Sequence, residues 1–148
     1  MSFFVDGPQD EAHRLMTDYF QGRSLKIVAS NSPSYLEAEF GSWTAMVLDD
    51  AKGNVKVDLV KAKHGSYAHL RFSFSSEYFV GTLVTIFFVA ATYIIYSMLA
   101  IPLLFALIVI LVEVVFVIGI IGYSVSLTRR KFIEELNLFL QSAAPKRE

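Results

Sequence analysis

Cysteine is absent from this chain of 148 residues. Its absence excludes disulfide bonds, thiolate metal sites, iron–sulfur clusters and cysteine nucleophiles. Excess positive charge is also missing, because the formal net charge is −1, and this argues against nucleic acid as a partner. A cleavable signal peptide is not evident, since residues 1–6 contain neither a basic segment nor a long apolar one.

Recognisable catalytic motifs are missing as well. The sequence contains no nucleophile-elbow glycine pattern, no phosphate-binding loop and no metalloprotease helix motif. The histidines, His13, His64 and His69, fall on a predicted helix, a turn and a strand, a distribution typical of surface histidines rather than of a metal site. We therefore expect neither an enzyme nor a cofactor.

Charge is almost absent from residues 78–127, where Glu113 is the single Asp, Glu, Lys or Arg. A bilayer core about 30 Å thick takes roughly 20 helical residues per crossing, so this stretch is long enough for two crossings. Pro102 lacks an N–H group and disfavours helix in the preceding residue, which places the turn there. We predict a transmembrane hairpin with helices at 78–99 and 103–126.

Basic residues predict the orientation of this hairpin. Arg129, Arg130 and Lys131 follow the second helix, Arg71 precedes the first, and the connecting turn is uncharged. Loops rich in Lys and Arg stay on the cytoplasmic side of a membrane. We therefore expect a multi-pass protein of the cell membrane with both termini in the cytoplasm.

Glu113 requires a physical explanation. It lies about ten residues, or roughly 15 Å, into the second helix, where an isolated charge costs several kcal/mol. A neutral carboxyl or a buried partner is therefore expected. Thr92 lies at the same depth on the first helix and could donate a hydrogen bond, and Tyr93 is a second candidate. Three interpretations stay open: a proton or cation site, a contact with another subunit, and a local hydrogen bond without further function.

The first 77 residues predict a small α+β domain. Asp6, Pro8 and Gln9 are signals of helix initiation, with Asp6 as the capping residue, and Gly22 ends the helix. The helix carries one apolar face, formed by Ala12, Leu15, Met16, Tyr19 and Phe20. Four strands are predicted at residues 25–29, 35–40, 55–60 and 67–74. The expected fold is one helix on a four-stranded antiparallel sheet.

Alternation within the last two strands suggests how they pair. Apolar residues recur at every second position, at Val55, Val57 and Leu59 and then at Ala68, Leu70 and Phe72. A two-residue turn at His64 and Gly65 predicts three cross-strand pairs: Leu59 with Leu70, Val57 with Phe72, and Asp58 with Arg71. Apolar residues then face apolar residues, and an acid faces a base.

The order of these features resembles a known group of proteins. A helix is followed by the segment Leu36-Glu37-Ala38-Glu39-Phe40-Gly41-Ser42-Trp43, then by Ala51-Lys52-Gly53, two strands and a hydrophobic hairpin. This order resembles uncharacterised small archaeal membrane proteins, which have an N-terminal helix plus β-meander domain and a two-helix transmembrane hairpin. The resemblance implies the same architecture and an archaeal source, and it implies no activity.

Residues 128–148 predict a cytoplasmic amphipathic helix with a frayed end. Its apolar face is formed by Phe132, Ile133, Leu136, Phe139 and Leu140. This face could lie on the membrane, pack on the N-terminal domain or contact a partner.

Trp43 is the only tryptophan, and two positions are open for it. It could pack in the domain or, with Met46 and Leu48, form a docking patch. The candidate partner contacts are therefore Trp43, Phe132, Leu136 and Phe139.

These features favour a non-catalytic accessory or assembly subunit of a larger membrane protein complex. The chain offers several contact surfaces and no recognisable chemistry, so its expected partners are larger membrane protein subunits and the lipid bilayer. One alternative is a homo-oligomeric ion or proton transport component that uses Glu113. Another is a membrane-tethered sensor whose cytoplasmic domain binds a ligand or a protein.

Overall fold

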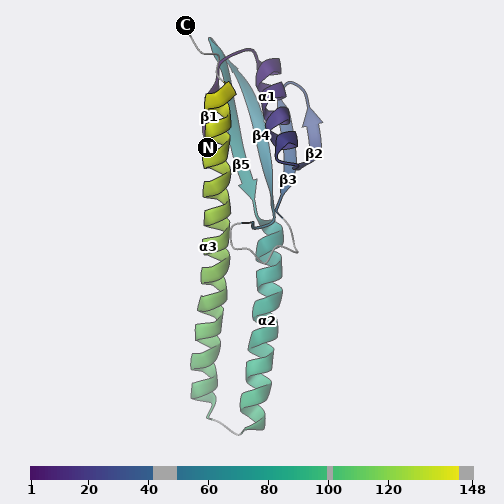
Figure 1. Cartoon of the computed structure of the whole chain (residues 1–148). Helices are drawn as coiled ribbons and strands as arrows, with labels where there is room; N and C mark the ends of the chain where they lie inside the picture. The colour runs from purple at the N-terminus through teal and green to yellow at the C-terminus, as the bar shows by residue number, and fades with distance from the viewer. Residues whose placement is uncertain (42–49, 100–101, 144–148) are drawn as a thin grey trace.

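A computed structural model describes residues 1–41, 50–99 and 102–143 of the chain (Figure 1). An α+β domain is followed by two long helices, whose hairpin projects from one end of the sheet, while the C-terminal part of α3 lies beside the domain. The elements are β1 (Ser2–Val5), α1 (Gln9–Gly22), β2 (Lys26–Asn31), β3 (Tyr35–Phe40), β4 (Gly53–Ala62), β5 (Gly65–Ser73), α2 (Ser75–Met98) and α3 (Leu103–Ala143). All neighbouring strands are antiparallel, in the order β1-β5-β4-β3-β2.

The sheet has five strands rather than the four predicted. The additional strand, β1, pairs with β5 from Ser2 opposite His69 to Val5 opposite Ser66. Four residues are too few to show a clear two-residue period, and what holds them extended is the free edge of β5. That edge exists only in the folded protein, so sequence patterning could not reveal this strand.

The predicted register of the β4–β5 hairpin is wrong by two residues. Ala62 pairs with Gly65, so Lys63 and His64 form the turn, and Val57 lies opposite Leu70. A shift of two residues keeps every side chain on its face of the sheet, so the apolar pattern cannot distinguish the two registers. The other predicted pairs change accordingly: Leu59 faces Ala68, Val55 faces Phe72, and Asp58 faces His69 while forming an ion pair with Arg71 diagonally.

Helix α1 covers one face of the sheet, as its apolar stripe predicts. Ala12, Met16, Tyr19 and Phe20 are buried there. The N-cap residue is Pro8 and not Asp6, because the helix begins at Gln9. The Gln9 amide instead donates a hydrogen bond to the carbonyl of Leu59 on β4, at 2.6 Å. This bond ties the start of the helix to the sheet below it.

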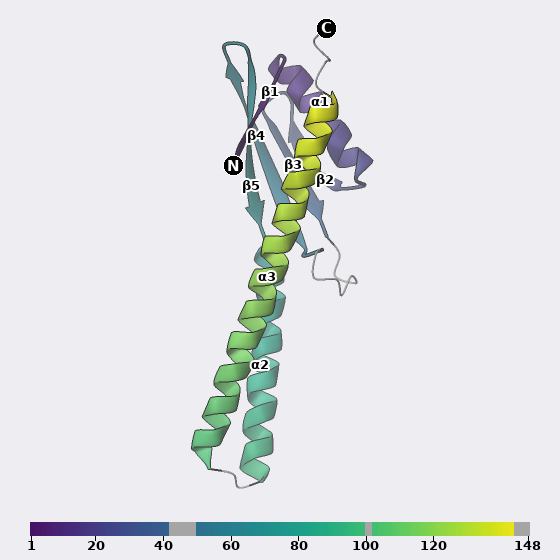
Figure 2. The ribbon, with the colours of Figure 1, turned by 60° about the vertical axis from the view of Figure 1, so that its left-hand side comes forward.

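Helix α3 continues without a break from the hairpin into the domain. Its 41 residues span about 60 Å, roughly twice the thickness of a bilayer core. The C-terminal part lies beside α1 on the same face of the sheet (Figure 2). The predicted tail is therefore the end of α3, and the domain core uses this segment in addition to residues 1–77.

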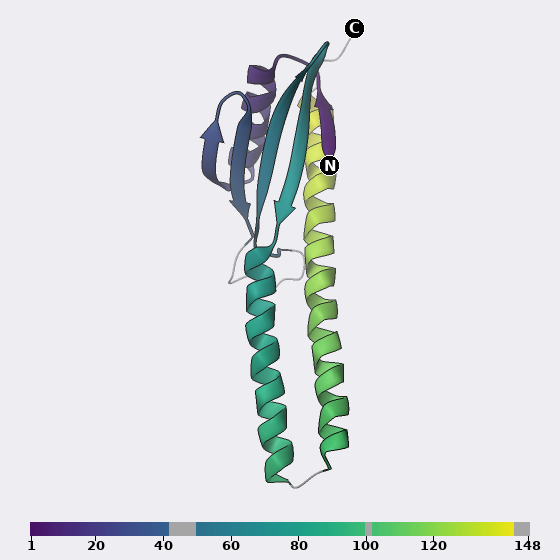
Figure 3. The same cartoon turned by 180° about the vertical axis from the view of Figure 1, so that it is seen from behind.

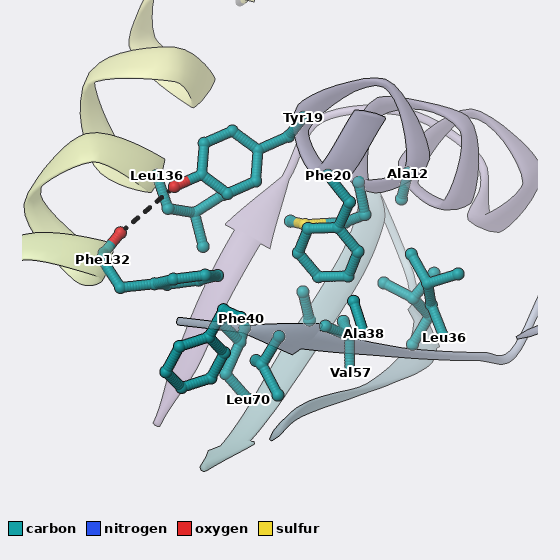
Figure 4. Close-up of a cluster of buried hydrophobic side chains, with 14 of the residues drawn as sticks. Ala12, Tyr19, Phe20, Leu36, Ala38, Phe40, Val57, Leu70, Phe132 and Leu136 are labelled. Carbon is teal, nitrogen blue, oxygen red and sulfur yellow. Dashed lines mark hydrogen bonds between the residues drawn. The ribbon is translucent and has the colours of Figure 1, made fainter. Parts of the chain in front are cut away.

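Two side chains of this segment complete the core. Phe132 is 2% exposed and Leu136 is 0% exposed, and both lie among Tyr19, Phe20 and Phe40 (Figure 4). The ring of Phe132 lies 5.7 Å from that of Tyr19 and 5.6 Å from that of Phe40. Phe132 and Leu136 were candidate partner contacts, and this assignment is corrected, because the chain covers both of them itself.

Helix α2 and the N-terminal part of α3 form an apolar hairpin that could span a membrane. Within the described residues, both helices are long and apolar enough to cross a bilayer. Of the most apolar 18-residue stretch of each helix, only 11% in α2 and 6% in α3 is buried inside the protein. The two helices run side by side away from the sheet (Figure 3). Such an uncovered apolar surface is compatible with insertion into lipid.

Candidate functional site

The polar residues Thr92 and Glu113 meet in the interior of the hairpin. The hydroxyl of Thr92 donates a hydrogen bond of 2.7 Å to Oε1 of Glu113. The helices are antiparallel, so residues that lie equally far from the turn face each other, and Thr92 is 7% exposed at this contact. This is the interhelical contact that their equal depth predicts.

The second carboxyl oxygen of Glu113 lies in a different environment. Oε2 is buried and has no hydrogen-bond partner among the described residues. A carboxylate in hydrocarbon without compensating donors is costly. A donor that reaches Oε2 would remove this cost.

Tyr93 does not take part in this contact. It follows Thr92 in the chain, and one residue turns an α-helix by about 100°. Its side chain is accordingly directed away from the helix pair and is 58% exposed. Of the two predicted partners of Glu113, Thr92 therefore forms the hydrogen bond.

A groove of about 400 Å³ lies beside Glu113 between the two helices. Its apolar lining includes Val80, Val84, Phe88, Phe116, Val117 and Ile120. The helices approach each other closely at Gly81, where an added Cβ atom would lie 1.9 Å from Cδ1 of Ile121. Small residues at such positions allow close packing of transmembrane helices.

Two hydrogen bonds connect the hairpin to the segment before β4. The amide of Ala51 donates to Oγ1 of Thr128 on α3, at 2.9 Å, in a buried position. The amide of Lys52 donates to Oε2 of Glu77 on α2, at 3.4 Å. Both helices are thus fastened to the same segment where they leave the domain. Sequence analysis missed these contacts, because neither Thr128 nor Glu77 belongs to a periodic pattern.

Helix α1 is fastened to α3 by a polar cluster at the edge of the core. Arg23 forms an ion pair with Glu135 and also donates to the hydroxyl of Tyr19, at 3.4 Å. The Tyr19 hydroxyl donates in turn to the carbonyl of Phe132, at 3.4 Å. Burial raises the pKa of Tyr19, partly opposed by the charge of Arg23. These contacts hold the end of α3 against the domain.

The other predicted site residues have different positions. Phe139 is partly buried against the core, with its ring 5.2 Å from that of Tyr19. Trp43, Met46 and Leu48 lie outside the described residues. His13 and His69 are hydrogen-bonded to Ser30 and Ser2 in exposed positions. Within the described part of the chain, no group of three or more His, Cys, Asp or Glu side chains could hold a metal ion.

The sequence matches no protein-family model and no curated protein. The contacts described above are therefore the basis for a functional proposal.

Proposed function

We propose that this protein is a non-catalytic accessory or assembly subunit of a larger membrane protein complex. Its hairpin spans the cell membrane and packs laterally against larger membrane protein subunits. The α+β domain and both termini lie in the cytoplasm, at the end of the hairpin followed by Arg129, Arg130 and Lys131. The domain then forms a brace on the cytoplasmic side of the complex.

The observation that carries this proposal is the continuity between the hairpin and the domain. A single residue, Phe74, separates β5 from α2, and α3 runs from the hairpin turn into the domain core. The Arg23–Glu135 ion pair and the bond between Ala51 and Thr128 reinforce these connections. A structure without a flexible linker holds its domain at a defined height above the membrane, which is what a brace requires.

The groove beside Glu113 supplies the lateral contact of this proposal. Its lining is mostly apolar, as expected of a surface that packs against another transmembrane helix, and it includes Glu113, whose Oε2 atom is buried. A partner helix that brings a hydrogen-bond donor to this depth would satisfy the carboxyl. Contact with a partner would thus combine close packing with one specific polar interaction.

Native purification tests this proposal. The tagged protein is extracted from its own membrane in mild detergent, its native mass is measured, and the co-purifying chains are identified by mass spectrometry. We expect a defined complex with other membrane proteins. Val84→Trp fills the groove and should reduce the yield of those partners. The control is Leu83→Trp, which should not reduce it, because Leu83 is exposed and does not line the groove. A stable monomer without partners would contradict the proposal.

A second candidate is a homo-oligomeric transport component, and the unpartnered Oε2 of Glu113 is the observation that favours it. Oε1 is occupied by the Thr92 hydroxyl, so Oε2 is the atom of Glu113 at which a transported cation or proton would bind. If this candidate is right, liposomes with the purified protein show proton or cation flux, and Glu113→Gln abolishes it. Absence of flux with the unmodified protein excludes this function.

A further inference from the structure

Tyr93 presents a hydroxyl group on the outside of the hairpin at the depth of Glu113. Its side chain is 58% exposed, and it forms no hydrogen bond or ring contact within the described residues. It follows Thr92, which bonds to Glu113, so it lies within about 1.5 Å of that depth along the helix axis. Tyrosine is enriched at membrane interfaces, where water and headgroups satisfy its hydroxyl. With the hairpin in a bilayer, the Tyr93 hydroxyl would instead be an unused donor in hydrocarbon.

The matching acceptor is Oε2 of Glu113. Oε1 accepts the Thr92 hydroxyl, whereas Oε2 is buried and has no partner among the described residues. A carboxylate only accepts hydrogen bonds, and a tyrosine hydroxyl can donate one, so the two groups are electrostatically complementary. Glu113 also lines the groove between the helices, so this groove is the route by which an external donor reaches its carboxyl.

The face of α2 that carries Tyr93 is opposite to the groove. Val84 lines the groove, and Tyr93 lies about two and a half helical turns further along α2, so the two side chains point in opposite directions. A neighbouring copy inserted in the same direction would place its Tyr93 face against this groove at equal depth. Such a contact joins two different faces of the chain, which is the head-to-tail type that forms rings when the rotation closes.

We infer that the groove beside Glu113 receives α2 of a second copy of this chain, whose Tyr93 hydroxyl donates a hydrogen bond to Oε2 of Glu113. This bond satisfies both groups at once, and the mostly apolar lining buries the tyrosine ring. The inference rests on the proposed function, because it needs the hairpin in a membrane and names the helix that the groove receives. Larger subunits would then contact the hairpin outside the groove.

Thiol crosslinking in native membranes tests this contact, because the chain contains no cysteine of its own. Two differently tagged versions of the full-length protein are co-expressed, one with Ile86→Cys and the other with Ile120→Cys. Ile86 lies about two helical turns before Tyr93 and shares its face of α2. Ile120 lines the Glu113 groove, within about one helical turn of the depth of Ile86. A short thiol crosslinker should join the two versions, with Tyr93 and Glu113 unchanged.

Ile118→Cys is the matched control for Ile120→Cys. Ile118 lies on the same helix and is more exposed than Ile120, but it lines, together with Ile86, a groove that does not include Glu113. Ile118→Cys should therefore give little product with Ile86→Cys. Equal product from both pairs would show random collision, and no product from Ile86→Cys with Ile120→Cys would show that no copy occupies the groove. Either result overturns the inference.

Tyr93→Phe tests the hydroxyl itself. It should weaken association about threefold per contact, the effect of an average interhelical hydrogen bond in a membrane. Energy transfer between copies labelled at Lys63→Cys, in liposomes diluted with lipid, measures this change. Tyr78→Phe is the control, because Tyr78 is similarly exposed, at 53%, but lies at the domain end of α2. Equal association of the unmodified protein and Tyr93→Phe would overturn the contact between Tyr93 and Glu113.

These results are separate from the native purification described above. If the crosslink forms but no larger membrane protein co-purifies, the accessory function is rejected and the inference stands. If larger subunits co-purify and the crosslink does not form, the inference is rejected and the accessory function stands.

Discussion

The hydroxyl of Thr92 donates a hydrogen bond to Oε1 of Glu113 across the hairpin, at 2.7 Å. Both groups lie within the apolar part of the two helices, where the chain provides few other polar groups. With the hairpin inserted in lipid, as proposed, no water would replace a lost partner of either group. This hydrogen bond joins α2 to α3 within the hairpin.

Thr92→Val should therefore weaken the hairpin. Interhelical hydrogen bonds in membranes contribute about 0.6 kcal/mol on average and up to about 1.7 kcal/mol. We expect a loss in this range in the free energy of unfolding, measured by denaturation in mixed micelles. Thr85→Val is the matched control, because the Thr85 hydroxyl donates to the carbonyl of Gly81 on its own helix. Equal losses in both variants would contradict an interhelical role for Thr92.

Phe132→Ala should destabilise the α+β domain strongly, although residue 132 is distant in sequence from the rest of its core. The side chain is 2% exposed, and truncation of a buried Phe typically costs about 3–5 kcal/mol. Denaturant unfolding of the full-length protein, monitored by near-ultraviolet circular dichroism, measures this loss. Leu138→Ala, on the same helix and 66% exposed, should change the stability by no more than about 0.5 kcal/mol. Similar stability of the two variants would show that α3 is not part of the core.

Tyr35 and Glu37 should make the domain sensitive to high pH. Their hydrogen bond raises the pKa of Tyr35 to about 12, from the ordinary value of 10.0. In the unfolded chain Tyr35 ionises near pH 10, so its contribution to stability is complete below pH 10 and is lost as the pH rises toward 12. Tyr35→Phe should remove this part of the pH dependence, measured by denaturant unfolding between pH 8 and pH 12.

The same bond should act in the opposite direction at low pH. The hydrogen bond from Tyr35 lowers the pKa of Glu37 below its ordinary value of 4.5. The stability contributed by Glu37 is therefore complete above pH 4.5 and decreases as the pH falls through the lower folded value. If Tyr35→Phe left both the acid and the alkaline limbs unchanged, the two side chains would not be coupled.

Cysteine labelling should establish the orientation of the chain, because the natural sequence contains no cysteine. Lys63→Cys lies in the β4–β5 turn, and Pro102→Cys lies at the hairpin turn. A membrane-impermeant maleimide applied to intact cells should label position 102 and not position 63. Inside-out vesicles should give the reverse pattern. Labelling of both positions from the same side would exclude a hairpin that spans the membrane.

Local patterns were sufficient for much of the fold. The stripe from Ala12 to Phe20 predicted α1, alternation around Val57 and Leu70 identified the buried face of the sheet, and Pro102 marked the hairpin turn. Equal depth along two helices predicted the contact between Thr92 and Glu113. In each case the deciding interaction is local or follows from one simple geometric relation.

Long-range packing decided the remainder. The register of β4 and β5 differs from the prediction by two residues, because an even shift preserves the apolar face and turn geometry selects between the alternatives. The short strand β1 forms only because β5 presents an edge. The apolar face of the tail was compatible with lipid, a partner or the domain, and a periodic pattern contains no information about which surface covers it.

Hydrophobic length and periodicity are properties of the chain alone, and they predicted an apolar hairpin that contains Glu113 beside a small α+β domain. No local pattern indicates that Phe132 and Leu136 complete the domain core, or that α3 runs from the hairpin into that core without a break. Those outcomes depend on which surfaces become available once α1 and the sheet have folded, and burial against them is what gives the end of α3 its position.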